Sequence, residues 1–244
     1  MMTKKRKRWL SLIVPLILLL VIGSSIYLMD YYHASDTAMN MLEHPASDVT
    51  ILQEDDRIAF VPNKPLAGMI FYPGGKVAYE AYAPLLESCA EAGILCVIPQ
   101  MPGNLAVLDQ NAADGIIEEY PQISNWYLAG HSLGGTIAGI YLSEHLENYQ
   151  GLILLASYCN VDLSRSDMEV LSIYGSEDGV MNRTAYEKNW PMLPDTKKEV
   201  IIEGGCHAYF GNYGEQAGDG SPSITRQEQQ RQTVEEIVRF VLPS

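Results

Sequence analysis

Gly130, Ser132 and Gly134 form the pattern G-x-S-x-G within the stretch WYLAGHSLGG. An apolar run precedes this pattern, and the apolar segment TIAGIYLSEHL follows it. A serine on a tight turn between a strand and a helix needs small neighbours, because its strained backbone packs closely against both elements. Its hydroxyl then projects at the N-terminus of the helix, where developing negative charge is stabilised. This context predicts Ser132 as an activated nucleophile rather than an ordinary turn serine.

A serine hydroxyl is a weak acid that needs a base, and the base needs a carboxylate to orient it. In open-sheet hydrolases these groups follow the serine in the order acid, then histidine, each on a loop after a strand. Asp178 follows the apolar run 169–175, and His207 follows the run 198–204. Both positions lie at the carboxyl ends of strands, where an open α/β sheet binds its ligands.

Two acidic residues compete with Asp178 for the orienting role, namely its neighbour Glu177 and Asp162, which follows the preceding strand. No other histidine competes strongly with His207 for the role of base. His131, for example, occupies the variable position of the G-x-S-x-G pattern, which any residue can fill. We therefore predict a catalytic triad of Ser132, Asp178 and His207.

Eight short apolar runs alternate with helical patterns along the chain. Most runs are continuous rather than alternating in hydrophobicity, which is typical of strands buried on both faces of a mostly parallel sheet. They occupy residues 49–52, 57–62, 67–73, 94–99, 125–130, 151–157, 169–175 and 198–204. The helical patterns occupy residues 79–93, 109–121, 136–148 and 226–241. This alternation predicts an α/β fold, a three-layer α/β/α sandwich with right-handed crossovers.

From about residue 49 to 242 the chain resembles an α/β-hydrolase of the compact, dienelactone-hydrolase-like kind. The resemblance rests on AGHSLGG as nucleophile elbow, YGSEDGV as acid loop and GGCHAYFGNYG as histidine loop. It implies Ser132 as nucleophile, Asp178 as acid and His207 as base. Dienelactone hydrolases use a cysteine nucleophile, whereas this chain has a serine, so the resemblance does not extend to their substrate.

Two connections bear on access to this site. The connection 158–168, where α/β-hydrolases usually insert a lid, is too short for a cap domain. The polar loop 211–227 after the histidine has two interpretations. It either partly roofs a substrate pocket, or it is a solvated surface loop. The first interpretation makes three aromatic residues substrate-binding candidates, Tyr209, Phe210 and Tyr213.

An oxyanion hole needs two backbone N–H groups, one from the residue after the nucleophile and one from the loop after an earlier strand. Leu133 is the first donor. The loop in FYPGGKVAYEAYAPL offers either Gly75 or Lys76 as the second, and Gly74 and Gly75 let the backbone approach a substrate closely. This chemistry needs no metal and no organic cofactor.

The N-terminus has the pattern of a membrane-targeting segment. Residues 4–8 are all basic, and residues 9–29 contain no charge and span about 30 Å as a helix, which matches a bilayer core. Basic residues before an apolar span favour a cytoplasmic N-terminus, with the following domain outside. We expect a basic cytoplasmic segment, a single-pass anchor in the cell membrane, a linker and an α/β-hydrolase domain at residues 1–8, 9–29, 30–48 and 49–244. The alternative is a cleaved signal peptide and a secreted domain.

The formal charge of −14 understates how acidic the exported part is. Of the 16 basic residues, five lie at positions 4–8, so the remaining 11 face 30 acidic residues, a charge of −19. A domain of this charge repels phosphate backbones, which argues against nucleic acid binding.

Four cysteines are present, and their spacing does not suggest a zinc site. Cys159 and Cys206 lie on loops after strands that we expect to be close together, and an exported domain permits disulfides. These two residues therefore form a disulfide or remain free thiols.

The sequence supports two hypotheses about function. The first is a membrane-tethered or secreted serine hydrolase that cleaves an ester or related acyl bond in a small-molecule or acylated substrate through an acyl-enzyme. The second is a non-catalytic extracytoplasmic binding domain on the same scaffold. The fold does not separate them because function belongs to the site, but the intact order of Ser, Asp and His favours the enzyme.

Overall fold

The structure of the chain, a computed structural model, describes residues 4–243 and divides them into two compact units. The first unit contains helix α1 (Lys4–Met29), with Pro15 inside it. No helix among the described residues reaches the length and apolarity that crossing a bilayer requires. The predicted segments 1–8 and 49–244 extend beyond the described residues at 1–3 and 244.

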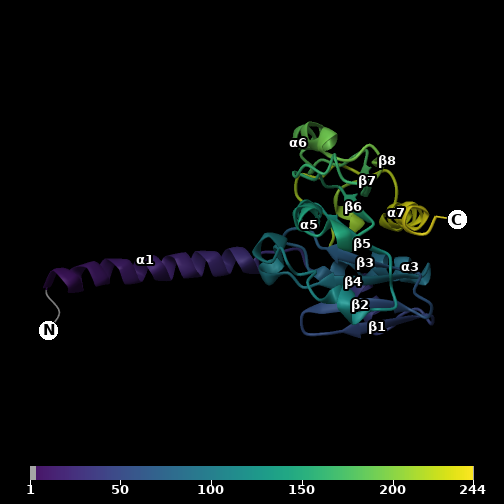
Figure 1. Cartoon of the computed structure of the whole chain (residues 1–244). Coiled ribbons are helices and arrows are strands. Elements are labelled where there is room, and N and C mark those ends of the chain that lie inside the picture. Colours follow the sequence, from purple (N-terminus) through teal and green to yellow (C-terminus); the bar gives the residue numbers. More distant parts are fainter. Residues whose placement is uncertain (1–3, 244) are drawn as a thin grey trace. The chain divides into compact units, whose positions relative to one another are not determined.

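The second unit begins at Tyr32 and is built on one eight-stranded sheet (Figure 1). The strand order is β1-β2-β4-β3-β5-β6-β7-β8, with β2 antiparallel to both β1 and β4 and every other pairing parallel. Each predicted apolar run forms one of these strands, which confirms the predicted α/β fold. The bounds are β1 (Val49–Gln53), β2 (Arg57–Pro62), β3 (Ala67–Tyr72), β4 (Ile94–Pro99), β5 (Trp126–His131), β6 (Gly151–Leu155), β7 (Glu169–Gly175) and β8 (Lys198–Ile202).

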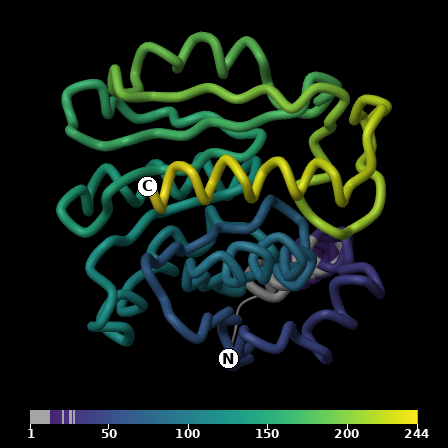
Figure 2. The backbone as a smooth tube through the Cα atoms, turned by 90° about the vertical axis from the view of Figure 1, so that its right-hand side faces the viewer, coloured from purple at the N-terminus to yellow at the C-terminus, as the bar shows by residue number. Residues whose placement is uncertain are grey.

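Helices cover both faces of the sheet and complete three layers. Figure 2 looks onto the face covered by α3 (Ala83–Glu91) and α7 (Arg226–Val241), where α2 (Asp36–Glu43) also packs. The opposite face carries α4 (Ile116–Glu119), α5 (Leu133–Ser143) and α6 (Arg183–Asn189). Short 3₁₀ turns are η1 (Tyr79–Tyr82), η2 (Pro102–Asn104), η3 (Ala106–Leu108), η4 (Leu146–Asn148), η5 (Trp190–Met192) and η6 (Ala208–Phe210).

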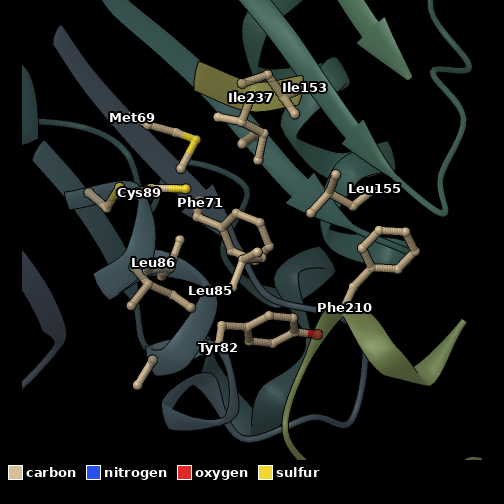
Figure 3. Packing of buried hydrophobic residues seen from close by; sticks show 14 of the residues in the cluster. Met69, Phe71, Tyr82, Leu85, Leu86, Cys89, Ile153, Leu155, Phe210 and Ile237 are labelled. Carbon is tan, nitrogen blue, oxygen red and sulfur yellow. The ribbon is translucent and has the colours of Figure 1, made fainter. Parts of the chain in front are cut away.

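The two faces bury alternate residues of the same strands, as side chains of a strand point in turn to either side. Met69 and Phe71 of β3 lie in the cluster beneath α3 and α7, while Ile70 and Tyr72 lie in the cluster beneath α5. Figure 3 shows the first cluster, in which the rings of Phe71 and Tyr82 lie 5.0 Å apart between their centroids. Strands buried on both faces explain why their sequences are continuous apolar runs.

The predicted helix over 109–121 is mostly absent, since only α4 is helical there. The Tyr72 hydroxyl donates to the Gln110 carbonyl at 2.7 Å and accepts from the Ala113 N–H at 3.0 Å, so it takes backbone groups that a helix would use. Gly115 then adopts φ 79°, a left-handed conformation that separates this turn from α4.

Much of the predicted linker 30–48 folds onto the domain. The Ser35 hydroxyl caps α2, and Ala38 and Leu42 are buried. The Ala46 N–H donates to Glu87 Oε1 at 2.7 Å, which fixes the end of the segment against α3. Residues from Tyr32 onward therefore belong to the compact unit of the sheet.

Candidate active site

Ser132 occupies a sharp turn between β5 and α5, with φ 51° and ψ −123°. The two glycines of the pattern, Gly130 and Gly134, leave no room for a side chain. A Cβ atom on Gly134 would lie 2.2 Å from the Tyr72 carbonyl oxygen, and one on Gly130 would lie 2.5 Å from the Gly135 nitrogen. Strained backbone of this kind persists where the surrounding structure enforces it, typically at functional sites. The glycine spacing is therefore a packing requirement of the turn that presents the serine.

Asp178 and His207 form a buried pair. Nδ1 of His207 lies 2.9 Å from Oδ2 of Asp178, and the two side chains are 1% and 0% exposed. The other carboxylate oxygen accepts hydrogen bonds from the Val180 N–H at 2.9 Å and the Met181 N–H at 2.8 Å. Because the carboxylate only accepts, the proton of the neutral imidazole sits on Nδ1. This leaves Nε2 with its lone pair available as a base.

Nε2 of His207 is buried and has no hydrogen-bond partner among the described residues. The bond from the Ser132 hydroxyl to this nitrogen, which a complete triad would contain, is therefore not formed in the structure. Such bonds are often long in the free enzyme and tighten once substrate is bound. The structure thus pairs acid with histidine and leaves the nitrogen that would face the serine unpaired.

The two competing acids lie away from the histidine. Glu177 is exposed and accepts a hydrogen bond from the Ser176 hydroxyl. Asp162 is also exposed and accepts from the backbone and side chain of Ser164. The geometry therefore favours Asp178 as the residue that orients His207.

The loop after β3 contacts the elbow at Gly75. The Lys76 N–H already donates to the Asn104 carbonyl at 2.7 Å, which leaves the Gly75 N–H as the candidate. A Cβ atom on Gly75 would lie 2.9 Å from Leu133 Cδ2, so the two predicted donor residues are in contact. Leu133 is the first residue of α5, where helix N–H groups have no intrahelical partner. The geometry therefore favours Gly75 over Lys76 as the candidate for the second oxyanion donor.

A cleft of about 240 Å³ opens at Ser132. The elbow, the end of β6 and the acid loop contribute its walls, since the lining residues are Ser132, Leu133, Thr136, Ala156, Ser157, Tyr158, Val180, Met181 and Asn182. Residues 156–168 join β6 directly to β7, and no cap domain covers the cleft in this connection. The cleft is therefore reached from solvent without passing a lid.

Comparison with protein families decides the identity of the fold. The sequence profile described as "Alpha/beta hydrolase family" matches residues 68–231, a segment that contains the elbow, Asp178 and His207. The chain belongs to the alpha/beta hydrolase family. The predicted membership, the compact lidless form and the prediction of an enzyme are thereby confirmed.

Solved structures share the fold of this α/β-hydrolase at low sequence identity. Dienelactone hydrolase from Anabaena variabilis is 16% identical, with 80% of this chain and 99% of that chain covered and a TM-score of 0.58. A hyperthermophilic esterase from the archaeon Pyrobaculum calidifontis is 14% identical, with 84% and 88% covered and a TM-score of 0.60. The monoacylglycerol lipase of Paleococcus ferrophilus is 15% identical, with 78% and 98% covered and a TM-score of 0.58. The comparison with curated proteins gives no sequence match.

The three aromatic residues predicted to bind substrate do not line the Ser132 cleft of the hydrolase. Phe210 is fully buried in the core cluster beside Tyr82 (Figure 3). Tyr213 is buried and packs on Tyr32 with ring centroids 5.5 Å apart, and the Arg226 guanidinium covers Tyr209, 4.3 Å from its centroid. These side chains anchor the loop after His207 and do not roof the site.

The disulfide between Cys159 and Cys206 is not formed, and all four cysteines are buried free thiols. Cys159 belongs to the cluster beneath α5 and Cys206 to the cluster beneath α3 and α7, so the sheet separates them. Burial raises the pKa of the Cys159 thiol to about 11 and that of the Cys206 thiol to about 12. Within residues 4–243, no group of three His, Cys, Asp or Glu side chains is arranged to hold a metal ion.

Asp219, which the sequence analysis did not single out, joins the acid and histidine loops. One carboxylate oxygen accepts from the Gly179 N–H and the His207 N–H, each at 3.1 Å, and the other accepts from the Ala208 N–H at 2.8 Å. Burial acts to raise the pKa of Asp219, but these hydrogen bonds outweigh it and the net pKa is lowered. The loop 211–227 is therefore neither roof nor solvated surface at this point, because it inserts a carboxylate beside the Asp178–His207 pair.

His131 was also missed as a functional candidate. Its ring is 1% exposed and lies 4.6 Å from the His207 ring, centroid to centroid. Burial lowers the pKa of His131 well below its ordinary value, and the neighbouring His207 lowers it further. No sequence signal distinguishes this histidine from any other residue at the variable position of the elbow.

Proposed function

We propose that this hydrolase cleaves esters or related acyl bonds through a Ser132–His207–Asp178 triad and an acyl-enzyme. The observation that carries the proposal is the buried His207–Asp178 pair, whose unpartnered Nε2 belongs to the same domain as a strained elbow serine at an open cleft. The esterase and the lipase that share its fold support ester bonds as the target.

The proposed reaction proceeds in two halves. Nε2 of His207 takes the Ser132 proton as the serine oxygen attacks the acyl carbon, and Asp178 holds the imidazole and stabilises its charged form. The N–H groups of Leu133 and Gly75 donate to the tetrahedral oxyanion. His207 then returns the proton to the leaving alcohol, which departs with the electrons of the broken bond. A water molecule, activated by the same nitrogen, releases the acid and restores the serine.

The cleft favours small substrates. Its volume of about 240 Å³ lies below the range of about 300–1,000 Å³ that is typical of pockets for drug-sized ligands. Polar side chains of Thr136 and Asn182 line it beside Met181. The acidic charge of the chain disfavours anionic substrates. We therefore propose short-chain, neutral or cationic acyl compounds as the substrate class.

Hydrolysis of chromogenic p-nitrophenyl esters from acetyl to decanoyl tests this function. We expect the wild type to prefer the short chains and His207→Ala to lower kcat by about 10⁶-fold, with KM little changed. His44→Ala is the matched control, because that histidine is exposed and its Nδ1 bonds within its own helical turn, at the Asn40 carbonyl. A folded wild type that hydrolyses none of the esters would instead support a non-catalytic binding domain.

We also propose that the domain lies outside the cell, tethered by its N-terminal segment in the cell membrane. The basic cluster at 4–8 and the uncharged run 9–29 support this placement. Membrane fractionation of cells, followed by external protease treatment of spheroplasts, tests it. A full-length protein in the membrane fraction that external protease digests supports the tether. A shortened protein in the medium supports secretion, and a protected protein contradicts both.

A further inference from the structure

A continuous chain of buried hydrogen bonds links the oxyanion loop to the histidine loop. The Gly74 N–H donates to the Tyr82 hydroxyl oxygen at 3.0 Å. That hydroxyl lies 2.8 Å from Nδ1 of His131, and Nε2 of His131 lies 3.2 Å from the His207 carbonyl oxygen. Tyr82 and His131 are 0% and 1% exposed, so solvent does not compete for these bonds.

The two ends of this chain determine where every proton sits. A backbone carbonyl only accepts, so Nε2 of His131 must donate its proton to His207. Nδ1 of the neutral ring is then an acceptor, and the Tyr82 hydroxyl must donate to it. The Tyr82 oxygen in turn accepts from Gly74, which only donates. A protonated His131 would carry a proton on Nδ1 and would no longer accept the hydrogen bond that the Tyr82 hydroxyl donates.

The surroundings hold this arrangement tightly. A Cβ atom on Gly74 would lie 2.8 Å from both Nδ1 of His131 and the Tyr82 oxygen, so only glycine fits there without a shift. The His131 ring packs against the His207 ring and against Phe210, with centroids 4.6 Å and 5.7 Å apart. Tyr82 itself is fixed in the core cluster by Phe71 (Figure 3).

We propose that Tyr82 and His131 are positioning residues, a relay that holds the oxyanion donor at Gly75 and the base His207 at a fixed separation. Gly75 follows Gly74 in the chain, and His207 contributes the carbonyl at the other end, so the relay spans both halves of the reaction centre. His131 is also the residue before Ser132, which places the nucleophile beside the same support. The inference rests on the proposed ester hydrolysis.

Three single variants of the full-length protein test the relay. Tyr82→Phe removes the central hydroxyl, His131→Asn keeps an acceptor near Nδ1 but no donor for His207, and His131→Gln keeps a donor near Nε2. We expect each to lower kcat on a short-chain ester by about 10- to 100-fold with KM within about twofold, as displaced catalytic groups do. Tyr127→Phe, in a buried tyrosine on the same face of the sheet, is the control and should retain full activity.

Two further readouts separate positioning from general stability. The double variant Tyr82→Phe/His131→Asn should be no slower than the slower single variant, because one broken link already interrupts the relay. In the wild type, ¹⁵N spectra of labelled histidine should show His131 as the neutral Nε2–H tautomer at pH 6, where an ordinary histidine with a pKa of about 6.5 is mostly protonated.

The outcomes distinguish the relay from the proposed function. The positioning role is wrong if the wild type is active and the variants of Tyr82 and His131 keep its kcat. It is also wrong if His131 is the Nδ1–H tautomer. Neither result contradicts the proposed triad. Additive losses in the double variant also overturn the positioning role. A wild type without hydrolytic activity overturns the proposed function, and the positioning role falls with it.

Discussion

Replacing Asp219 by asparagine tests how the histidine loop is held against the acid loop. Oδ1 of Asp219 accepts from three backbone N–H groups, those of Gly179, His207 and Gly220, and Oδ2 accepts from that of Ala208. Asparagine keeps one oxygen but turns an NH₂ group toward the remaining N–H, so two donors face each other. It also removes the charge that strengthens the other bonds.

The expected loss follows from these contacts. A hydrogen bond to a charged group contributes about 1.5–3 kcal/mol, and a buried donor left unpaired costs about 1–3 kcal/mol. With one bond lost and three weakened, we expect Asp219→Asn to lower the free energy of unfolding by about 3 kcal/mol. For a domain of this size that is a fall in Tm of roughly 6–12 °C.

The difference should also depend on pH. The folded-state pKa of Asp219 is lowered, because its hydrogen bonds outweigh the effect of burial. A depressed carboxyl pKa contributes stability that is fully present above the unfolded value of about 3.9 and is lost as the pH falls through the lower folded value. The gap between wild type and Asp219→Asn should therefore be constant from pH 6 to 8 and shrink below about pH 4.

Urea unfolding followed by circular dichroism at several pH values measures this gap. Glu215→Gln is the matched control, since Glu215 is an exposed carboxylate in the same loop. An Asp219→Asn midpoint equal to that of the control, or a gap that widens toward pH 4, would refute the reasoning.

Three further tests concern the elbow, the orienting acid and the cysteine thiols. Gly134→Ala puts a Cβ atom 2.2 Å from the Tyr72 carbonyl oxygen, so we expect a loss of about 3 kcal/mol in thermal unfolding, and an unchanged Tm would contradict the packing. Asp178→Asn should lower kcat about 10⁴-fold in ester assays while circular dichroism stays that of the wild type. Thiol titration should find four free thiols only after unfolding, because burial keeps Cys206 at a pKa of about 12, and fewer than four would indicate a disulfide.

The strands could be predicted from sequence because their signal is local. Continuous apolar runs such as 94–99 and 151–155 need no information from elsewhere in the chain. Helix α6 was missed because it is short and buries a single side chain, Tyr186, so it lacks a periodic apolar face. The prediction of a helix over 109–121 was wrong because Tyr72, distant in sequence, bonds to backbone groups that the helix would use.

The residues of the site also differ in whether a local sequence signal reveals them. Ser132, Asp178 and His207 each lie in a recognisable stretch after a strand, so their candidacy was visible in the sequence. His131 and Asp219 act through partners that only the fold brings together, such as the carbonyl and the N–H of His207. Aromatic residues of a polar loop suggested a pocket, but no local signal shows that they pack inward.

The most direct test of the central claim is to label the full-length protein with a fluorophosphonate and locate the adduct by peptide mass spectrometry. We expect one adduct per chain, on Ser132, that disappears in Ser132→Ala and is formed far more slowly in His207→Ala. Ser157 lines the same cleft and provides an internal control. An adduct on Ser157, or a folded wild type that takes up no label, would contradict the assignment of Ser132 as the activated nucleophile.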